Sequence, residues 1–419
     1  MTAGTLVIGA SQAGVQLAAA LRDFGYDDPI TLVGAEAPAP YQRPPLSKAY
    51  LAGRADAASL ALRTETFFRD QRITVLTGER VLRLRLSPTG PAGSGTALTD
   101  RGRRLPFDRL ALTVGARPRR LRVPGADLDG VCYLRDVGDA TRLRDRLARA
   151  RQVVVVGGGF IGLEAAAVAR SQGRQVTVVE ATDRLASRVV APVVSEFYRA
   201  AHTRRGTDVR LGAEVSEILG LRGRARAVHL ADGGQLPADL VVVGVGVVPR
   251  QELAQQLGLT CDHGIVVDEF ARTSEPSVVA AGDCTVLPNP LTGRGRLRLE
   301  SVPNAVAQAR VAAATLTGRL EPYRDVPWFW SDQFDLTLQI AGVADGYDQV
   351  VVRGDPGTER FSVLHYLDGR LQAVAAVNRP ADYLAVRKAL AQDIPLPPER
   401  AMHTDVPLKD LLRQPTTTP

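Results

Sequence analysis

Short apolar runs alternate with amphipathic stretches over the first two thirds of the chain. Four runs are predicted to be buried strands: Thr5–Ile8, Ile30–Val33, Gln152–Val156 and Val176–Val179. Between the members of each pair, apolar residues recur at helical spacing, as in Leu163–Ala169. Strand–helix–strand units of this kind predict an α/β fold with parallel sheets.

The pattern changes after Pro327. Four short β-like runs follow, separated by Gly and Asp turns: Leu336–Ala341, Gln349–Val352, Ser362–Tyr366 and Leu371–Val377. Their spacing predicts an antiparallel sheet, and Ala381–Ala391 is predicted to be a helix. The C-terminal part is therefore expected to be α+β.

Each of the two strand–helix turns carries a glycine motif. The first turn has Gly9, Ser11 and Gly14 in the pattern G-x-S-x-x-G, and Glu36 follows its second strand. This order is typical of a Rossmann unit, in which glycines admit a pyrophosphate to the helix N-terminus and the acid accepts ribose hydroxyls. A single motif of this kind can also be a plain connection.

The second turn has the full pattern G-x-G-x-x-G, formed by Gly157, Gly159 and Gly162. Glu180 follows 23 residues after the first glycine, where a ribose 2′-hydroxyl is expected. A carboxylate there repels a 2′-phosphate and favours NADH, although Arg184 and Arg188 keep NADPH open. Two complete motifs in one chain predict two dinucleotides, and the usual pair is FAD with a nicotinamide cofactor that donates hydride.

Two later strands end in further glycines. Leu240–Val243 leads to Gly246, a candidate contact of the nicotinamide cofactor, and Val278–Ala281 leads to Gly282 and Asp283. A carboxylate after such a strand is suited to the ribityl hydroxyls of FAD, whereas a Gly-Asp pair alone is often only a turn. After two Rossmann motifs, we interpret this pair as the return of the chain to the FAD domain.

Five segments carry a more specific resemblance: Arg43–Lys48 (RPPLSK), Gly157–Glu164 (GGGFIGLE), Gly282–Cys284, Glu300–Asn304 and Trp328–Gln333. With them, the chain resembles the putidaredoxin reductase and biphenyl dioxygenase ferredoxin reductase group. The resemblance implies a glutathione-reductase-like fold with two Rossmann-like domains and a C-terminal α+β interface domain. It also implies one FAD, NADH as donor and a [2Fe–2S] ferredoxin as acceptor, which serves a cytochrome P450 or a Rieske-type oxygenase.

The resemblance implies further flavin contacts, at Ala13, Lys48, Val81, Arg135, Asp283, Val302 and Trp330. One departure concerns the acid after the second strand, because this chain has Ala35 where the family often has a carboxylate. Glu36 is expected to take that ribose contact instead. The implied domains are FAD-binding (1–113 and 247–325), NAD-binding (114–246) and interface (326–419).

Three residues are candidates for catalysis. Lys48 would stabilise negative charge on the flavin, Glu164 would hydrogen-bond the nicotinamide carboxamide, and Trp330 would approach the isoalloxazine ring. Each has a plainer alternative: a solvated surface lysine, an acid favoured by the helix dipole and a core tryptophan.

The net charge of +7, with a pI near 9.6, raises the question of an anionic partner. Nucleic acid is disfavoured because the 52 cationic residues are spread along the chain among 45 acids. An acidic ferredoxin bound transiently is the better match, with Arg310 and Lys409 as candidate contacts on a monomer or weak dimer.

The three cysteines restrict the chemistry most. Cys132, Cys261 and Cys284 are far apart, and positions 40–50, where a redox-active pair is expected in disulfide reductases of this fold, hold none. Buried, inert thiols are expected. The alternatives that stay open are rubredoxin reductase, monodehydroascorbate reductase and a signalling flavoprotein similar to apoptosis-inducing factor.

Neither a metal site nor a membrane segment is expected. The five histidines show no ligand spacing, and each is expected to be an ordinary core or surface residue. The apolar stretch Val153–Ala169 contains three consecutive glycines and Glu164, which a bilayer would disfavour. No basic segment precedes the first apolar run, so no signal peptide and a cytoplasmic location are expected.

Overall fold

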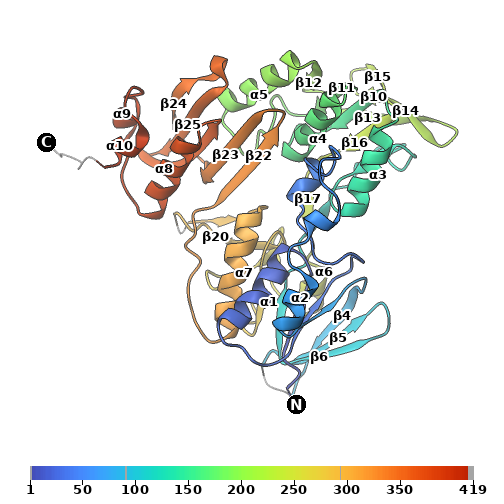
Figure 1. Cartoon of the computed structure of the whole chain (residues 1–419), viewed down its shortest axis with the longest axis vertical. Coiled ribbons are helices and arrows are strands. Elements are labelled where there is room, and N and C mark those ends of the chain that lie inside the picture. The colour runs from blue at the N-terminus through green and yellow to red at the C-terminus, as the bar shows by residue number, and fades with distance from the viewer. Residues whose placement is uncertain (1, 90–91, 293, 414–419) are drawn as a thin grey trace. The chain divides into compact units, whose positions relative to one another are not determined.

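The computed structural model describes residues 2–89, 92–292 and 294–413. The chain divides into two compact units, each assembled from three stretches of sequence, which the colours of Figure 1 allow the reader to follow. The first unit contains residues 1–42, 58–117 and 248–327. The second contains residues 43–57, 118–247 and 328–419, of which 414–419 lie outside the described residues.

A five-stranded parallel sheet forms the core of the first unit, in the order β19–β7–β1–β2–β3. Its strands are β1 (Thr5–Ile8), β2 (Ile30–Val33), β3 (Ile73–Leu76), β7 (Arg109–Leu112) and β19 (Val278–Ala280). Helices α1 (Gln12–Asp23) and α7 (Val302–Leu316) pack side by side beside this sheet (Figure 1). Buried alanines on both helices allow this close approach.

Smaller elements complete the first unit. One antiparallel sheet consists of β4 (Val81–Leu86), β5 (Gly95–Thr99) and β6 (Arg104–Phe107). A second small sheet contains β18 (Ile265–Val266), β20 (Thr285–Pro288) and β21 (Arg296–Leu297). The helical pieces are η2 (Ala58–Leu60), α2 (Glu65–Asp70) and α6 (Glu252–Gln256). Two of the crossings to the second unit lie in β8 (Ala116–Pro118) and β17 (Val247–Pro249).

The second unit has a parallel sheet of the same size, in the order β12–β11–β10–β16–β9. Its strands are β9 (Val131–Tyr133), β10 (Gln152–Val156), β11 (Gln175–Glu180), β12 (Thr207–Leu211) and β16 (Leu240–Val243). Its helical elements are η1 (Pro44–Ser47), α3 (Val137–Leu147), α4 (Phe160–Ser171) and α5 (Pro192–Arg204). Antiparallel strands β13 (Val215–Leu221), β14 (Arg224–Leu230) and β15 (Gln235–Pro237) form a separate sheet.

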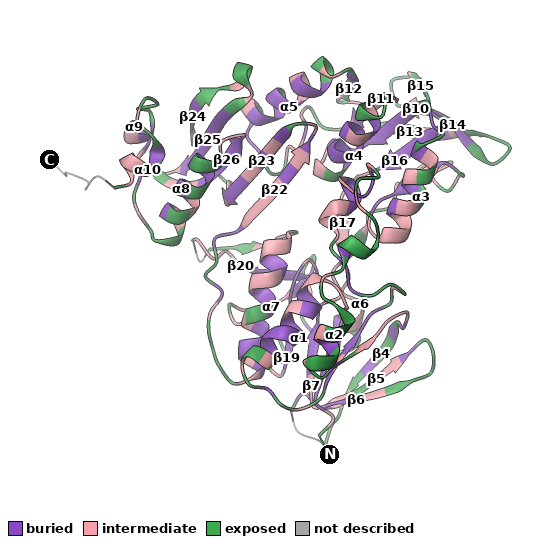
Figure 2. Cartoon of the chain, in the orientation of Figure 1, coloured by how far each residue is buried: buried purple, intermediate pink, exposed green. Residues whose placement is uncertain are grey.

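The C-terminal part of this unit is an antiparallel sheet in the order β22–β23–β26–β25–β24. Its strands are β22 (Trp328–Gln333), β23 (Leu336–Gly342), β24 (Gln349–Asp355), β25 (Arg360–Leu367) and β26 (Arg370–Val377). The helical pieces are η3 (Pro356–Thr358), α8 (Pro380–Ala391), α9 (Pro398–Ala401) and α10 (Leu408–Leu411). Strands β25 and β26 are largely buried, as Figure 2 shows.

The four strands and the helix predicted for this part are present. Strand β22 was not predicted, because its buried residues Ser331 and Gln333 are polar and hide the alternation that marks a strand. Among the described residues, no helix is both long enough and apolar enough to span a bilayer.

Two histidines are buried in the second unit, His202 on α5 and His365 on β25. Burial disfavours the charged imidazolium and lowers the pKa of each ring from about 6.5 to about 4. The unfolded chain therefore takes up protons at these positions before the folded chain does. Each histidine costs stability as the pH falls from about 6.5 to about 4.

The unmodified protein should lose stability as the pH falls from about 6.5 to about 4. We expect His365→Leu to reduce that loss of unfolding free energy by on the order of 2–3 kcal/mol. Thermal unfolding measured from pH 7.5 to 4.5 tests this, with His403→Leu, which replaces an exposed histidine, as the control. Equal slopes for His365→Leu and the unmodified protein would contradict the assignment.

Candidate functional site

The first glycine turn joins β1 to α1 and needs the absence of a side chain at two positions. Gly9 has a φ of +121°, and a Cβ there would lie 2.2 Å from the carbonyl oxygen of Thr113. On α1, a Cβ at Gly14 would lie 2.0 Å from the carbonyl oxygen of Gly9. The two glycines thus bring the turn against both the helix and the end of β7. Ser11 is the N-cap of α1, so the first N–H groups of the helix start directly after it.

A second segment of the first unit meets this turn. A Cβ at Gly282, which has a φ of +86°, would lie 3.2 Å from the Cβ of Ala13. The backbone of the Gly282–Asp283 pair therefore packs directly on the start of α1. The Gly282 N–H donates to the side-chain oxygen of Gln308 on α7, at 2.8 Å, which fixes the segment from its other side. The structure thus brings together two of the predicted FAD segments, the first glycine turn and the Gly282–Asp283 pair.

The remaining predicted residues of the first unit lie on separate elements. Val81 begins β4 and is buried, and Val302 is the first residue of α7. Glu36 is half-buried and accepts a hydrogen bond from the hydroxyl of Tyr41, whereas Ala35 is exposed. Of the two neighbouring positions, only residue 36 therefore presents an anchored carboxylate after β2.

The second glycine turn, between β10 and α4, repeats this construction. A Cβ at Gly157, with φ at +105°, would lie 2.6 Å from the carbonyl oxygen of Gly244, and one at Gly162 would lie 2.3 Å from that of Gly157. Gly159, the N-cap of α4, differs because a Cβ there would meet its nearest atom only at 4.0 Å. The fold leaves space for a side chain at Gly159, so packing within the protein does not require a glycine at this position.

Glu180 closes this turn at the end of β11. Its carboxylate accepts hydrogen bonds from the N–H of Gly158 at 2.6 Å and from the N–H and hydroxyl of Thr182 at 2.8 and 2.9 Å. The guanidinium of Arg184 donates to the carbonyl oxygens of Ser187 and Val190, both at 2.7 Å, and is committed to its own loop. Arg188 is exposed, and its Nη2 lies 3.7 Å from the Cβ position of Gly246.

A buried ion pair lies farther along α4. Glu164 is only 3% exposed, and its Oε2 accepts hydrogen bonds from the Lys48 ammonium at 2.7 Å and from the hydroxyl of Ser47. Its other oxygen, Oε1, accepts from the Ser331 hydroxyl at 2.7 Å. Burying a carboxylate is expensive unless it is paired and hydrogen-bonded, and these three donors meet that requirement.

Lys48 is therefore not a solvated surface lysine, because its side chain is 18% exposed and bound to Glu164. The segment that carries it is anchored by Arg43, whose Nη1 donates to the carbonyl oxygen of Arg135 at 2.7 Å. Pro44 and Pro45 begin η1 and stiffen this segment. The sequence did not single out Ser47 and Ser331 as partners of Glu164. The available signal was a small hydroxyl residue inside each of the motifs Arg43–Lys48 and Trp328–Gln333.

Trp330 lies on the opposite face of β22 from Ser331, since alternate residues of a strand point to opposite sides. It is half-buried, and its ring centroid lies 5.7 Å from that of Trp328. On the other face, Phe329 packs against Phe160 at the start of α4, with centroids 4.9 Å apart. Strand β22 thus presents the two tryptophan rings on one side, and Phe329 with Ser331, the donor to Glu164, on the other.

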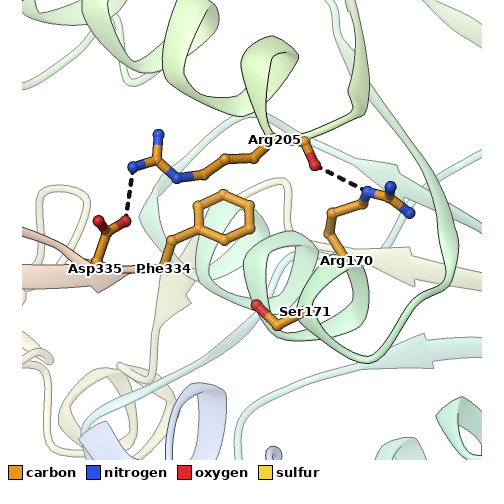
Figure 3. Close-up of a pocket in the computed structure, with 5 residues that line it drawn as sticks. All are labelled: Arg170, Ser171, Arg205, Phe334 and Asp335. Carbon is orange, nitrogen blue, oxygen red and sulfur yellow. Dashed lines mark hydrogen bonds and ion pairs between the residues drawn. The ribbon is translucent and has the colours of Figure 1, made fainter.

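A surface hollow of the second unit is lined by Arg170, Ser171, Arg205, Phe334 and Asp335 (Figure 3). Its two guanidinium groups are already committed. Arg205 pairs with Asp335 at 2.7 Å and with Glu359 at 2.9 Å, and Arg170 Nε donates to the carbonyl oxygen of Arg205. The Arg205 guanidinium lowers the pKa of Glu359 to about 2. We assign no nucleotide to this hollow.

The three cysteines lie on separate segments of the chain. Cys132 and Cys284 are buried, as expected, whereas Cys261 is half-buried, which corrects the expectation for that residue. Cys261 escapes full burial because it lies in a short bridge at Ile265 on the edge of a small sheet. Desolvation raises the pKa of all three thiols, that of Cys284 to about 12, so reactive thiolates are disfavoured.

Two family models match this chain. The family model described as "Pyridine nucleotide-disulphide oxidoreductase" matches residues 4–309, and the model "Reductase C-terminal" matches residues 328–412. The chain belongs to the pyridine nucleotide-disulphide oxidoreductase family. The family is one of oxidoreductases that use FAD and NAD(H), so the predicted enzyme class and cofactors are confirmed.

Individual relatives are similar over nearly their whole length. Rhodocoxin reductase of Rhodococcus erythropolis is 48% identical over 405 residues, 96% of this chain and 93% of the relative. The ferredoxin reductase for the CYP199A2 system of Rhodopseudomonas palustris superposes with a TM-score of 0.92 at 43% identity, covering 97% and 99% of the two chains. A covalent putidaredoxin reductase–putidaredoxin complex gives 0.93 at 39% identity, with 98% of each chain covered. The predicted resemblance and fold class are thereby confirmed.

The glycine turns fit the two cofactors of the family. Gly9, Gly14 and Gly282 have little or no room for a Cβ and so bring the backbone against the start of α1, which we call the first cradle. Gly159 leaves space at the N-terminus of α4, which we call the second cradle. Backbone N–H groups at a helix start bind phosphates, and the close packing brings the backbone within reach of them. The chain thus presents one such cradle in each unit.

The two glycines of the second turn are expected to respond differently to alanine. Gly162→Ala should lower the free energy of unfolding by the ~1–3 kcal/mol typical of overpacking, because its Cβ would strike the backbone of Gly157. Its melting temperature should fall accordingly. Gly159→Ala should leave the melting temperature within a few degrees, since the fold has room, but weaken NADH binding about tenfold. Thermal unfolding and NADH titration check both; unchanged NADH affinity in Gly159→Ala would contradict the assignment.

Proposed function

We propose that this protein is an NADH-dependent reductase that passes electrons through FAD to a [2Fe–2S] ferredoxin serving a cytochrome P450 or a Rieske-type oxygenase. One observation carries the proposal: Lys48, bound to Glu164, occupies the region where a disulfide reductase would need a cysteine pair. When bound, NADH supplies a hydride and FAD accepts it and releases the electrons one at a time. The similarity to a ferredoxin reductase and to a putidaredoxin reductase in complex with putidaredoxin supports a ferredoxin as the acceptor.

We assign the first unit's cradle to FAD. The pyrophosphate would bind the N-terminus of α1, Glu36 would accept the ribose hydroxyls and Asp283 those of the ribityl chain. The remaining assigned contacts are Gly9, Ser11, Ala13, Gly14, Val81 and Val302 in the first unit and Lys48, Arg135 and Trp330 in the second. The proposed domains are residues 1–113 with 247–325 for FAD, 114–246 for NAD and 326–419 for the interface.

The turn formed by Gly157, Gly159 and Gly162 is assigned to NADH. Glu180 already binds two backbone N–H groups, and its charge faces the place where a 2′-phosphate would lie. Arg184 is committed to its loop, which weakens the case for NADPH. Arg188, exposed beside Gly246, is the one of these two arginines that remains available to a phosphate.

Glu164 has the capacity to orient the nicotinamide. A carboxylate offers about four lone-pair directions, and three are taken by Ser47, Lys48 and Ser331. The fourth is left for a donor such as the carboxamide N–H₂. Lys48 offsets the negative charge of Glu164 and supplies positive charge to this region.

A spectrum tests the reductase proposal directly. The purified protein should be yellow, and stoichiometric NADH added without oxygen should bleach the flavin absorption. Adding an oxidised [2Fe–2S] ferredoxin should restore the colour within seconds. A flavin that NADH leaves unbleached would overturn the reductase assignment, and recovery with rubredoxin or monodehydroascorbate but not with ferredoxin would replace the acceptor.

The ferredoxin is expected to approach the basic surface at α7. Arg310 is exposed, and its guanidinium lies over the Phe24 ring, 5.1 Å from the centroid. Arg319 covers the same ring at 5.0 Å, so two cations are held beside one aromatic side chain. Lys409, exposed on α10 in the second unit, is the second candidate. We propose that Arg310 steers an acidic ferredoxin to this surface, and that the reductase acts as a monomer or weak dimer in the cytoplasm.

Arg310→Glu should raise the KM for ferredoxin about tenfold at low salt and leave NADH-to-ferricyanide turnover intact. The difference should shrink above about 0.5 M salt, because ions screen the attraction. Arg83→Glu, which makes the same charge change at an exposed position of β4, is the matched control. Equal effects of both variants, or a parallel loss of ferricyanide turnover, would contradict the role of Arg310.

A further inference from the structure

The hydrogen bonds around Glu164 continue beyond Ser331. The amide Nε2 of Gln333 donates to the Ser331 hydroxyl at 3.1 Å, and the Oε1 of Gln333 lies 2.9 Å from Nε2 of His202 on α5. All three side chains are essentially inaccessible to solvent, at 0% exposure each. A continuous chain of buried polar groups thus runs from α5 through β22 to the carboxylate on α4.

The direction of every bond in this chain follows from one fact. The carboxylate of Glu164, paired with the Lys48 ammonium, can only accept, so Ser331 must donate its single proton to Oε1. Ser331 then accepts from the amide of Gln333. The Gln333 oxygen is left facing His202, so the imidazole must carry its proton on Nε2.

The state of His202 agrees with this order. Burial lowers its pKa to about 4, so the ring is neutral at physiological pH. Its Nδ1 is buried without a partner, which a neutral ring with its proton on Nε2 tolerates because no buried N–H is left unpaired. The ring also packs edge-on against Phe334, with centroids 5.0 Å apart, which holds it in place.

We propose that Ser331, Gln333 and His202 are positioning residues that hold the Glu164 carboxylate in a fixed orientation for the nicotinamide. This inference rests on the proposed function. The hydrogen bond from Ser331 holds Oε1, while Ser47 and Lys48 donate to Oε2. This arrangement fixes the direction of the one acceptor site that remains on the carboxylate. The C-terminal sheet thereby acts on NADH binding through a carboxylate on the NAD-binding part of the chain.

Glu164→Gln is the reference variant, and Ser331→Ala removes the bond to Oε1. We expect Ser331→Ala to lower the ratio of the flavin-reduction rate constant to the NADH dissociation constant about tenfold, as expected for a hydrogen bond to a charged group. Ser362→Ala is the matched control. Ser362 lies on β25 in the same sheet as Ser331 and donates to the buried carboxylate of Asp382 on α8 at 2.8 Å. Both alanine variants should lose similar thermal stability, but only Ser331→Ala should slow flavin reduction by NADH.

Position 333 tests the direction of the chain. Gln333→Met removes the amide that donates to Ser331 but adds no competing acceptor, so the NADH reaction should slow about threefold, less than in Ser331→Ala. In Gln333→Glu, a protonated carboxyl can replace the amide as a donor, whereas an ionised one competes for the proton of Ser331. This variant should therefore be close to the unmodified protein at low pH and slow at high pH. Stopped-flow reduction by NADH between pH 5.5 and 9 measures the difference.

Six titratable or charged groups lie near this position: His202 and Tyr198 on α5, Arg205 at the end of α5, Glu164 on α4, Lys48 after η1 and Asp332 on β22. Burial raises the pKa of Tyr198, which therefore stays neutral across this range. Gln333→Met, measured beside Gln333→Glu, reports the pH response of the groups other than residue 333. The difference between the two profiles then belongs to the new carboxyl.

The outcomes separate the inference from the function on which it rests. An unmodified protein that NADH does not bleach overturns the function, and a normal rate in Glu164→Gln overturns the role of that carboxylate. A slow Glu164→Gln with a normal Ser331→Ala overturns the positioning chain alone. Identical pH profiles for Gln333→Met and Gln333→Glu overturn the assigned direction.

Discussion

The buried charge of Glu164 is the constraint on which the second unit depends. Its carboxylate accepts from Ser47 and Lys48 of the segment 43–57 and from Ser331 of the segment 328–419, while Glu164 itself belongs to 118–247. These are the three stretches that make up the unit. A buried carboxylate without donors would cost several kcal/mol, so all three segments must arrive together before the charge is tolerable. The same requirement places an ammonium and an oriented carboxylate side by side.

The two glycine turns show one steric solution applied twice. In each, a Cβ at the last glycine would strike the carbonyl oxygen of the first, at 2.0 Å for Gly14 and 2.3 Å for Gly162. The helix can start close to the strand only if both positions lack side chains, and this closeness exposes its first N–H groups. The turns differ in what packs on them: Gly282 covers the first, whereas Gly244 covers the second. On the proposed assignment, each turn binds one dinucleotide, and the later segments decide which one it is.

Much of the fold could be predicted because its signals are local. Strands such as Thr5–Ile8 and Gln152–Val156 are continuous apolar runs, and the glycine patterns stand directly after them. What escaped prediction depends on distant partners. Ser331 and Gln333 look like surface residues of a loop until His202 and Glu164 are brought beside them. Glu36 was named from the sequence, but the Tyr41 hydroxyl that anchors its carboxylate was not.

The family is named for disulfide chemistry, yet the described thiols argue against it here. A redox-active disulfide needs two cysteines within reach of each other and a thiolate stabilised by nearby positive charge. This chain has no cysteine at positions 40–50, and burial makes its three thiols weaker acids. Lys48 carries the positive charge in this segment, but its ammonium is paired with the Glu164 carboxylate and not with a thiolate. With no cysteine pair to receive the electrons, they must leave such a site toward an external acceptor, as in the ferredoxin reductases that this chain resembles.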